Sequence, residues 1–241
     1  MLEAMANQPL RKVRPIRPAA SRPFGIAVGS NLDFPTDLDR RLLGPVAMAI
    51  DDVHGDGRLQ RVRVGLEDIG LRDEGMYDDG DHRISISPAT LYPRLVMIHE
   101  IGHLLDARAF EGMIGTAVRL ASRTLASFAE WRSITSTSRL VTLYVQTITD
   151  LQRQIANGSS TEDQVLAVRY PEYLVEPEEL WARAYLQDIV VHSTDDGLVE
   201  EWRRYRSEDA DSDLPEQWDD IDFEPIARSM DRVFAREGWR R

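Results

Sequence analysis

Alternation of apolar and polar residues marks two short strands in the first third of the chain. The valines and leucine of 61–66 and the isoleucines of 83–87 occupy every second position. This period places the apolar side chains on one face of a strand. An apolar run at 24–28 is consistent with a buried strand, and the polar, glycine-containing segment 73–81 indicates a loop. The pattern predicts a small β-sheet in which 61–66 and 83–87 are neighbours.

Most of the remaining chain has the spacing of helices. Apolar residues recur every three or four positions, which gives a helix one apolar stripe. Breaker residues separate these segments, as at Asn157-Gly-Ser-Ser160. The predicted helical segments are 37–52, about 90–105, 113–155, 177–191 and 223–239. Strands followed by helices predict an α+β fold.

The charge pattern sets the start of the folded region. Residues 1–30 contain five basic residues, four prolines and one acid, so we expect residues 1–23 to form a flexible basic arm. We expect residues 24–241 to form a single domain. Its α/β part is expected at about 24–110 and its helical part at about 111–241.

Composition narrows the chemistry that is available. The 241 residues include no cysteine, which excludes disulfides, thiolate metal sites and cysteine nucleophiles. Any metal would therefore be held by histidine and carboxylate side chains. The sequence has no apolar run of membrane-spanning length and no secretory signal peptide. We therefore expect no membrane partner, and a protein that is cytoplasmic or exported by a route other than the Sec pathway.

The acidic balance argues against nucleic acid as a partner. The net charge is −12, and residues 195–224 hold thirteen acids against three arginines. Such a stretch is typical of a solvated face or loop. An acidic chain with one short basic arm does not fit a nucleic-acid-binding protein.

The predicted helix at 90–105 carries a metal-binding motif, His99-Glu100-Ile101-Gly102-His103. Residues four apart lie one turn apart on one helix face, so both imidazoles can reach the same cation. Glu100 is offset by one position and can act as a general base on a metal-bound water. Histidines and a glutamate in an apolar helix need partners, and Zn²⁺ suits imidazole and carboxylate ligands. One zinc ion is therefore the expected cofactor.

The third ligand is expected from the helix that begins near residue 177. Glu172, Glu176, Glu178 and Glu179 cluster at its start, and periodicity does not choose between Glu178 and Glu179. Asp106 lies on the same helix face as His103, where its carboxylate can orient an imidazole N–H. Asp106 and Ala109 stand where a metzincin would have glycine and histidine, which excludes that class.

Two segments together resemble the catalytic domain of the anthrax lethal factor type of gluzincin. These are His99-Glu-Ile-Gly-His-Leu-Leu-Asp106 and Tyr173-Leu-Val-Glu-Pro-Glu-Glu-Leu-Trp-Ala-Arg-Ala-Tyr185. Variants of this family occur in phage and polymorphic-toxin proteins. The resemblance implies a zincin-like fold, with a small β-sheet whose edge strand packs on the active-site helix and a mainly helical C-terminal half.

The resemblance also assigns roles. Glu179 takes the position of the third metal ligand, and a tyrosine before it stabilises the oxyanion of the transition state. Tyr173 matches that tyrosine more closely than Tyr170. Arg183 is a departure, because the family has an acid at that position, and Asp106 would have to orient the histidines without it.

A strand before the metal helix suggests how a substrate binds. Zincins place an edge strand there, so Ile84, Ser85 and Ile86 are expected to pair with the backbone of a peptide substrate. The expected function is that of a zinc metalloendopeptidase acting on a protein or peptide. The alternatives are a zincin-like structural or interaction module with weak or lost cleavage, as in a phage or secretion system, and a regulator that cleaves one cognate partner. The sequence leaves the natural substrate and the oligomeric state open.

Overall fold

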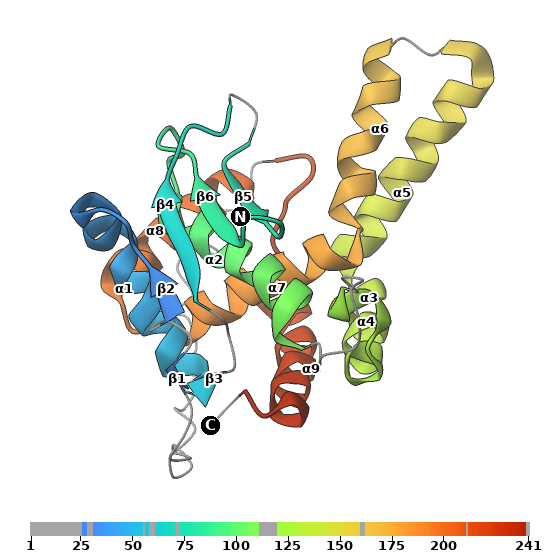
Figure 1. Ribbon diagram of the computed structural model, residues 1–241. Coiled ribbons are helices and arrows are strands. Elements are labelled where there is room, and N and C mark those ends of the chain that lie inside the picture. The colour runs from blue at the N-terminus through green and yellow to red at the C-terminus, as the bar shows by residue number, and fades with distance from the viewer. Residues whose placement is uncertain are drawn as a thin grey trace, which may run out of the picture.

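The computed structural model describes most of the chain and has an α+β fold (Figure 1). The described residues are 26–27, 31–54, 56–57, 61–70, 73–110, 120–159, 162–210 and 212–239. The predicted arm at 1–23 lies outside them, as does most of the predicted strand at 24–28.

The main sheet has four strands in the order β2-β4-β6-β5. These are β2 (Leu32–Asp33), β4 (Val62–Leu66), β5 (Gly75–Asp78) and β6 (Arg83–Ile86). β2, β4 and β6 are parallel, and β5 pairs antiparallel with β6. A second, two-stranded pair joins β1 (Ile26–Ala27) to β3 (Asp56–Gly57). The prediction that 61–66 and 83–87 are neighbours is therefore confirmed.

Two expectations for this region are wrong. Residues 75–78, within the predicted loop, form strand β5, which is paired on one side only among the described strands. Residues 83–86 are not at the edge, because β6 pairs with β4 on one side and β5 on the other. A four-residue strand that exposes part of each side chain has too little apolar pattern to be recognised from sequence.

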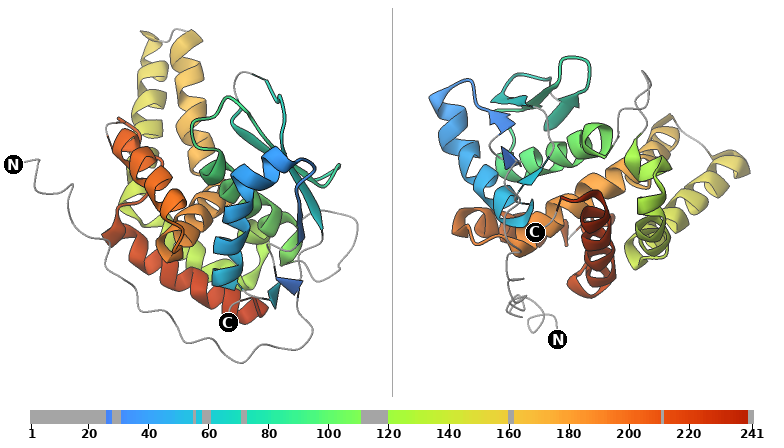
Figure 2. Two further views of the ribbon diagram at one scale, coloured as in Figure 1. Left: turned by 90° about the vertical axis from the view of Figure 1, so that its left-hand side faces the viewer. Right: turned by 60° about the horizontal axis from the view of Figure 1, so that its bottom comes forward.

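Helices pack against one face of the sheet and against each other. The described residues also form nine α-helices: α1 (Asp37–His54), α2 (Pro93–Leu104), α3 (Ala121–Thr124), α4 (Ala129–Ser136), α5 (Arg139–Gln154), α6 (Glu162–Leu174), α7 (Pro177–His192), α8 (Asp196–Asp209) and α9 (Asp220–Glu237). Shorter helical turns follow α2 (π-helical, Leu105–Ala109), precede α4 (3-10, Ala126–Phe128) and follow α5 (π-helical, Ile155–Ser159). α1 and α2 contact the sheet, and α7 packs against the other side of α2 (Figure 2). α5 and α6 form a hairpin that extends from the rest of the molecule (Figure 1).

The predicted helix at 177–191 is confirmed by α7, while the predicted block at 113–155 is divided. Leu125 is extended, and Ser138 is an N-cap whose side chain accepts the N–H of Val141, so α3, α4 and α5 are separate helices. Residues 111–119 lie outside the described part of this block. The buried apolar residues still form one continuous core, which runs from Leu32 to Trp239.

Candidate functional site

Helix α2 presents its two histidines one turn apart and toward the same point. Five of its apolar residues, Leu95, Met97, Ile98, Ile101 and Leu104, are buried, which fixes the rotation of the helix in the core. His99 Nε2 and His103 Nε2 are 3.1 Å apart, and their rings meet edge to face at a centroid separation of 4.7 Å. The spacing in the motif therefore gives two converging nitrogen donors.

Glu179, in the first turn of α7, completes this group. Its carboxylate oxygens lie 3.1 Å from His103 Nε2 and 3.5 Å from His99 Nε2. The neighbouring Glu178 instead accepts the Nε–H of Arg123 at 2.7 Å. Of the two glutamates that the sequence left open, Glu179 is the one that reaches the histidines.

The three donors fit a tetrahedral metal ion. At zinc–ligand distances of about 2.1 Å, ligand atoms of a tetrahedron are about 3.4 Å apart. The two Nε2 atoms are 3.1 Å apart, Glu179 Oε1 is 3.1 Å from His103 Nε2 and Glu179 Oε2 is 3.5 Å from His99 Nε2, so each distance is near this spacing. One ligand atom from each residue lies within 4.8 Å of the other two. Two imidazoles and one carboxylate, with a fourth position free for water or substrate, are a donor set that suits catalytic zinc.

The same contacts shift the pKa values of Glu179 and His103. Burial disfavours the ionised form of Glu179, but hydrogen bonds from His103 and His99 outweigh it and hold the pKa of this carboxyl far below its usual value. Burial would lower the pKa of His103, yet the hydrogen bond to Glu179 and the charge of that carboxylate raise it. Glu179 is therefore an anion in the folded protein.

A glycine allows α2 and α7 to approach closely enough for this convergence. A Cβ atom on Gly102 would lie 2.7 Å from the Cα atom of Ala182, a distance that side chains do not adopt. The two helices thus cross with backbone almost in contact, beside His103 and about one turn from His99 and Glu179. The sequence feature that indicates this close approach is a glycine inside an otherwise apolar helix.

Glu100 lies beside the histidines and against the edge strand. Its side chain is largely buried, and a Cβ atom on Gly75 of β5 would lie 2.9 Å from its Oε1 atom. Gly75 therefore leaves the space that the Glu100 carboxylate occupies. The sequence analysis did not identify Gly75, because the contact depends on how β5 packs on α2.

The two tyrosines near the end of α6 have different partners. Tyr173 lines the same cleft as Glu179, and burial together with the nearby Glu179 carboxylate raises the pKa of its hydroxyl. The Tyr170 hydroxyl donates to Glu216, away from the histidines. Tyr173 is accordingly the tyrosine that lies at the group of His99, His103 and Glu179.

Asp106 lies one turn beyond His103, in the π-helical turn, and its side chain is fully buried. Its carboxylate accepts the backbone N–H of Ser122 at 2.5 Å and the Ser122 hydroxyl at 2.7 Å. Within the described structure, no hydrogen bond joins Asp106 to either imidazole. Burial raises its pKa to about 6, although the bonds from Ser122 act in the opposite direction. Asp106 thus acts on His103 through its charge and ties the end of α2 to α3.

A carboxylate from another helix caps the start of α2. Tyr92, the N-cap residue, makes no side-chain cap. Glu201 of α8 accepts the N–H groups of Arg94 at 3.0 Å and Leu95 at 3.2 Å. An anion at a helix N-terminus also complements the helix dipole. Glu201 belongs to the acidic stretch expected to be solvated, and its burial corrects that expectation at this position.

A cleft of about 540 Å³ opens beside the histidines. Its walls come from β5, α2, the end of α6, α7, α8 and the segment before α9. Its lining includes Glu74, Gly75, His99, Glu100, Tyr173, Glu179, Arg183, Tyr205 and Glu216. A peptide-sized ligand in this cleft would meet His99, Glu179 and Glu100 together.

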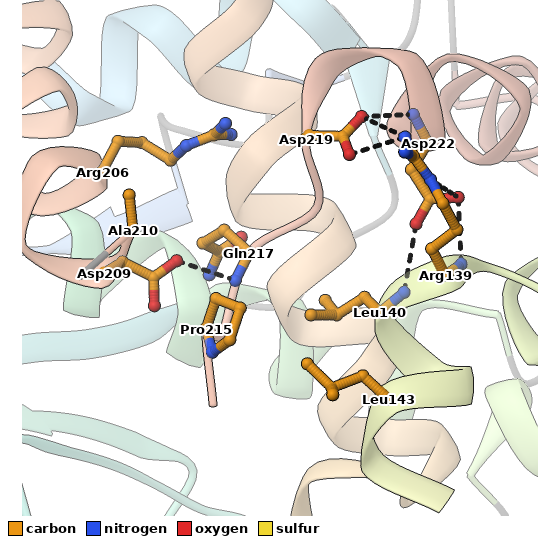
Figure 3. A pocket seen from close by; sticks show the side chains of 10 residues that line it. All are labelled: Arg139, Leu140, Leu143, Arg206, Asp209, Ala210, Pro215, Gln217, Asp219 and Asp222. Carbon is orange, nitrogen blue, oxygen red and sulfur yellow. Dashed lines mark hydrogen bonds and ion pairs between the residues drawn. The ribbon is translucent and has the colours of Figure 1, made fainter. Parts of the chain in front are cut away.

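A second hollow, of about 270 Å³, lies between α5, α8 and the start of α9 (Figure 3). Arg139 pairs there with Asp219 at 2.6 Å. Asp209 accepts the N–H groups of Glu216 at 2.6 Å and Gln217 at 3.1 Å. These bonds hold the segment before α9 in place, so the hollow's charged groups serve the fold.

The expected substrate contacts on β6 need correction. Ile84, Ser85 and Ile86 are fully buried, and the backbone of their strand is paired with β4 and β5. They therefore have no free strand edge to offer a peptide. That edge belongs to β5, whose residue Gly75 lines the cleft.

Two further findings concern membrane-spanning potential and similarity to known proteins. No helix in the described part of the chain is long and apolar enough to cross a membrane. Comparison with protein-family models, with curated proteins and with solved structures gives no significant match.

Proposed function

We propose that the protein is a zinc-dependent metallopeptidase with a zincin-like fold. The observation that carries the proposal is the convergence of His99 Nε2, His103 Nε2 and a Glu179 carboxylate oxygen beside the carboxylate of Glu100. His99, His103 and Glu179 would hold the ion. Bound zinc supplies Lewis-acid chemistry, which polarises a carbonyl group and lowers the pKa of water toward about 7.

The chain's own residues supply the proton transfers. Glu100 takes a proton from the water that attacks the scissile carbonyl and passes it to the leaving amine. The Tyr173 hydroxyl, which borders Glu179, donates a hydrogen bond to the oxyanion of the tetrahedral intermediate. Both groups line the same cleft, which supports their joint action on one peptide bond.

The outer edge of β5, which no other described strand pairs with, supports a peptide as substrate. An extended peptide can add to an exposed strand edge through main-chain hydrogen bonds. Because Gly75 of β5 lies against Glu100, a peptide on this edge would run past the general base. Recognition through the backbone favours hydrolysis within a chain.

The first prediction tests this function through metal content and hydrolysis. We expect about one zinc per chain in protein purified without chelators, and cleavage within a denatured peptide library. Glu100→Gln should keep the zinc and lose cleavage by at least about a hundredfold, because general bases contribute about that much. Glu179→Gln should lose zinc, while Glu178→Gln, which alters a glutamate paired with Arg123, should keep it.

The outcomes separate the alternatives. Protein without zinc under these conditions contradicts the metal site. Stoichiometric zinc without cleavage of the library, and without cleavage of any protein captured by the Glu100→Gln variant, favours a zinc-containing interaction module. Cleavage of one captured protein alone identifies a regulator with a single partner.

A further inference from the structure

Arg183 is a buried cation one turn after Glu179, and its guanidinium is almost fully engaged. Only 2% of the residue is exposed. Its Nε–H donates to the Glu179 carbonyl at 3.3 Å, and Nη1 donates to the Tyr144 hydroxyl at 2.8 Å and the Glu216 carbonyl at 2.9 Å. Nη2 donates to the Leu174 carbonyl. One side chain thus joins α5, α6, α7 and the segment before α9.

The charge is held without an ion pair. The rings of Tyr144 and Trp218 lie 5.4 and 5.6 Å from the guanidinium carbon of Arg183. Across the described residues, no ion pair links Arg183 to a carboxylate. Burying a cation in this way is costly unless its donors are satisfied. Here three of the acceptors are backbone carbonyls, so the guanidinium fixes main chain.

The fixed main chain forms two walls of the cleft. Leu174 directly follows Tyr173 at the end of α6. The Glu216 side chain accepts hydrogen bonds from Tyr170 and from Tyr205, which belong to α6 and α8. The guanidinium therefore ties two parts of the chain to the first turn of α7, which carries Glu179. These parts are the end of α6, which carries Tyr173, and the segment around Glu216. Movement of the guanidinium would release both.

We propose that Arg183 is a positioning residue that fixes the Tyr173 hydroxyl beside Glu179. The inference rests on the proposed function for its catalytic consequence, but the placement of Tyr173 is a property of the fold. Lysine at position 183 keeps the charge, but its single ammonium cannot reproduce the planar array of guanidinium donors. The last turn of α6, which carries Tyr173, would then be free to shift relative to Glu179.

A double-mutant cycle measures this coupling. Arg183→Lys should lower kcat by about ten- to a hundredfold with a small change in KM, since a displacement of about 1 Å at a reacting centre has that effect. In a Tyr173→Phe background, Arg183→Lys should change kcat by no more than about twofold, because the group it positions is gone. Multiplicative losses of kcat in the double variant would overturn the proposal.

Amide hydrogen exchange tests the placement without any activity. In metal-free protein, Arg183→Lys should accelerate exchange about tenfold in 170–176 and 214–218 and leave 93–104 unchanged. Unchanged exchange in 170–176 overturns the proposal even if the protein is a peptidase. Accelerated exchange in a protein without hydrolysis supports the placement and counts against the proposed function alone.

Two further variants complete the design. Arg206→Lys is the matched control, because Arg206 also donates to a carbonyl of the segment before α9, that of Trp218 at 2.7 Å, and also faces an indole ring. It should leave kcat and exchange in 170–176 unchanged. If Arg183→Lys does not fold, Tyr144→Phe removes one acceptor of the guanidinium and should give smaller changes in the same direction. No change in exchange in that variant overturns the proposal.

Discussion

Neighbouring side chains at this site differ in chemistry because their partners differ. Glu178 and Glu179 are adjacent in sequence, yet Glu178 pairs with Arg123 while Glu179 reaches both histidines. Tyr170 and Tyr173 lie three apart, yet only Tyr173 faces Glu179. Residue type and spacing left two candidates for the third metal ligand and two for the tyrosine. The rotation of α6 and α7 about their axes determines which candidate of each pair faces the histidines.

The tyrosines provide the second prediction. Tyr173→Phe should lower kcat by about a hundredfold, the usual effect of removing one oxyanion donor, with little change in KM. Tyr170→Phe loses a hydroxyl that is bonded to Glu216 and should change kcat by less than about threefold. Steady-state kinetics on one peptide checks both, and equal losses in the two variants would show that Tyr173 has no special role.

The third prediction concerns the acidity of His103. In metal-free protein its pKa lies above the usual histidine value, because the bond and charge of Glu179 outweigh the opposing effect of burial. Glu179→Gln removes that carboxylate, so burial should then lower the pKa of His103. Titration of the imidazole resonances by NMR measures the shift, with Glu178→Gln as the variant that should leave it unchanged. An unaltered titration in Glu179→Gln contradicts the contact.

At the scale of elements, the crossing of α2 and α7 determines whether the donors meet, and it provides the fourth prediction. Gly102→Ala forces the helices apart at Ala182 and should lower the free energy of unfolding by about 2 kcal/mol and weaken zinc binding. Gly44→Ala is the control, because its Cβ would meet only an ordinary contact at 3.8 Å and alanine favours a helix. Denaturant unfolding and zinc titration measure both variants, and equal effects would argue against close packing at Gly102.

Elements with a strong local pattern were predictable, and those defined by their neighbours were not. α2 and α7 have apolar residues and a proline in the first turn, so both were expected close to their observed bounds. β5 depends on pairing with β6, and its glycine is needed because Val96 and Glu100 of α2 pack against it. The edge strand was therefore assigned to β6, one strand too far along the chain.

At the scale of the whole molecule, the buried carboxylate of Asp106 links the site to stability and gives the fifth prediction. Its pKa is about 6 in the folded protein against 3.8 ordinarily, so the folded state binds a proton more tightly between pH 4 and 6. The free energy of unfolding should therefore fall as pH rises through that window, by about 3 kcal/mol. Denaturation of metal-free protein at several pH values should show this slope, and Asp106→Asn should remove that part of it. Parallel curves for the two proteins would contradict the assignment.

Most of the contacts that support the candidate site join residues far apart in the sequence, so a local sequence pattern cannot predict them. The motif predicted His99, Glu100 and His103, and a resemblance selected Glu179 and Tyr173. Arg183 stood out only as a departure, because its acceptors come from four separate elements. Glu201 gave no local signal, since an acid that caps a distant helix looks like any other acid on α8.

The cap on α2 has a consequence for the order in which the molecule is made. A ribosome completes the helix with His99 and His103 long before it adds Glu179, and later still Glu201, whose carboxylate binds the first turn of that helix. A nascent chain that ends before α8 therefore carries the histidine pair on a helix without its cap. The first turn of α2 should therefore be fully capped only after α8 has emerged, so that a chain released before that point would hold this helix less firmly.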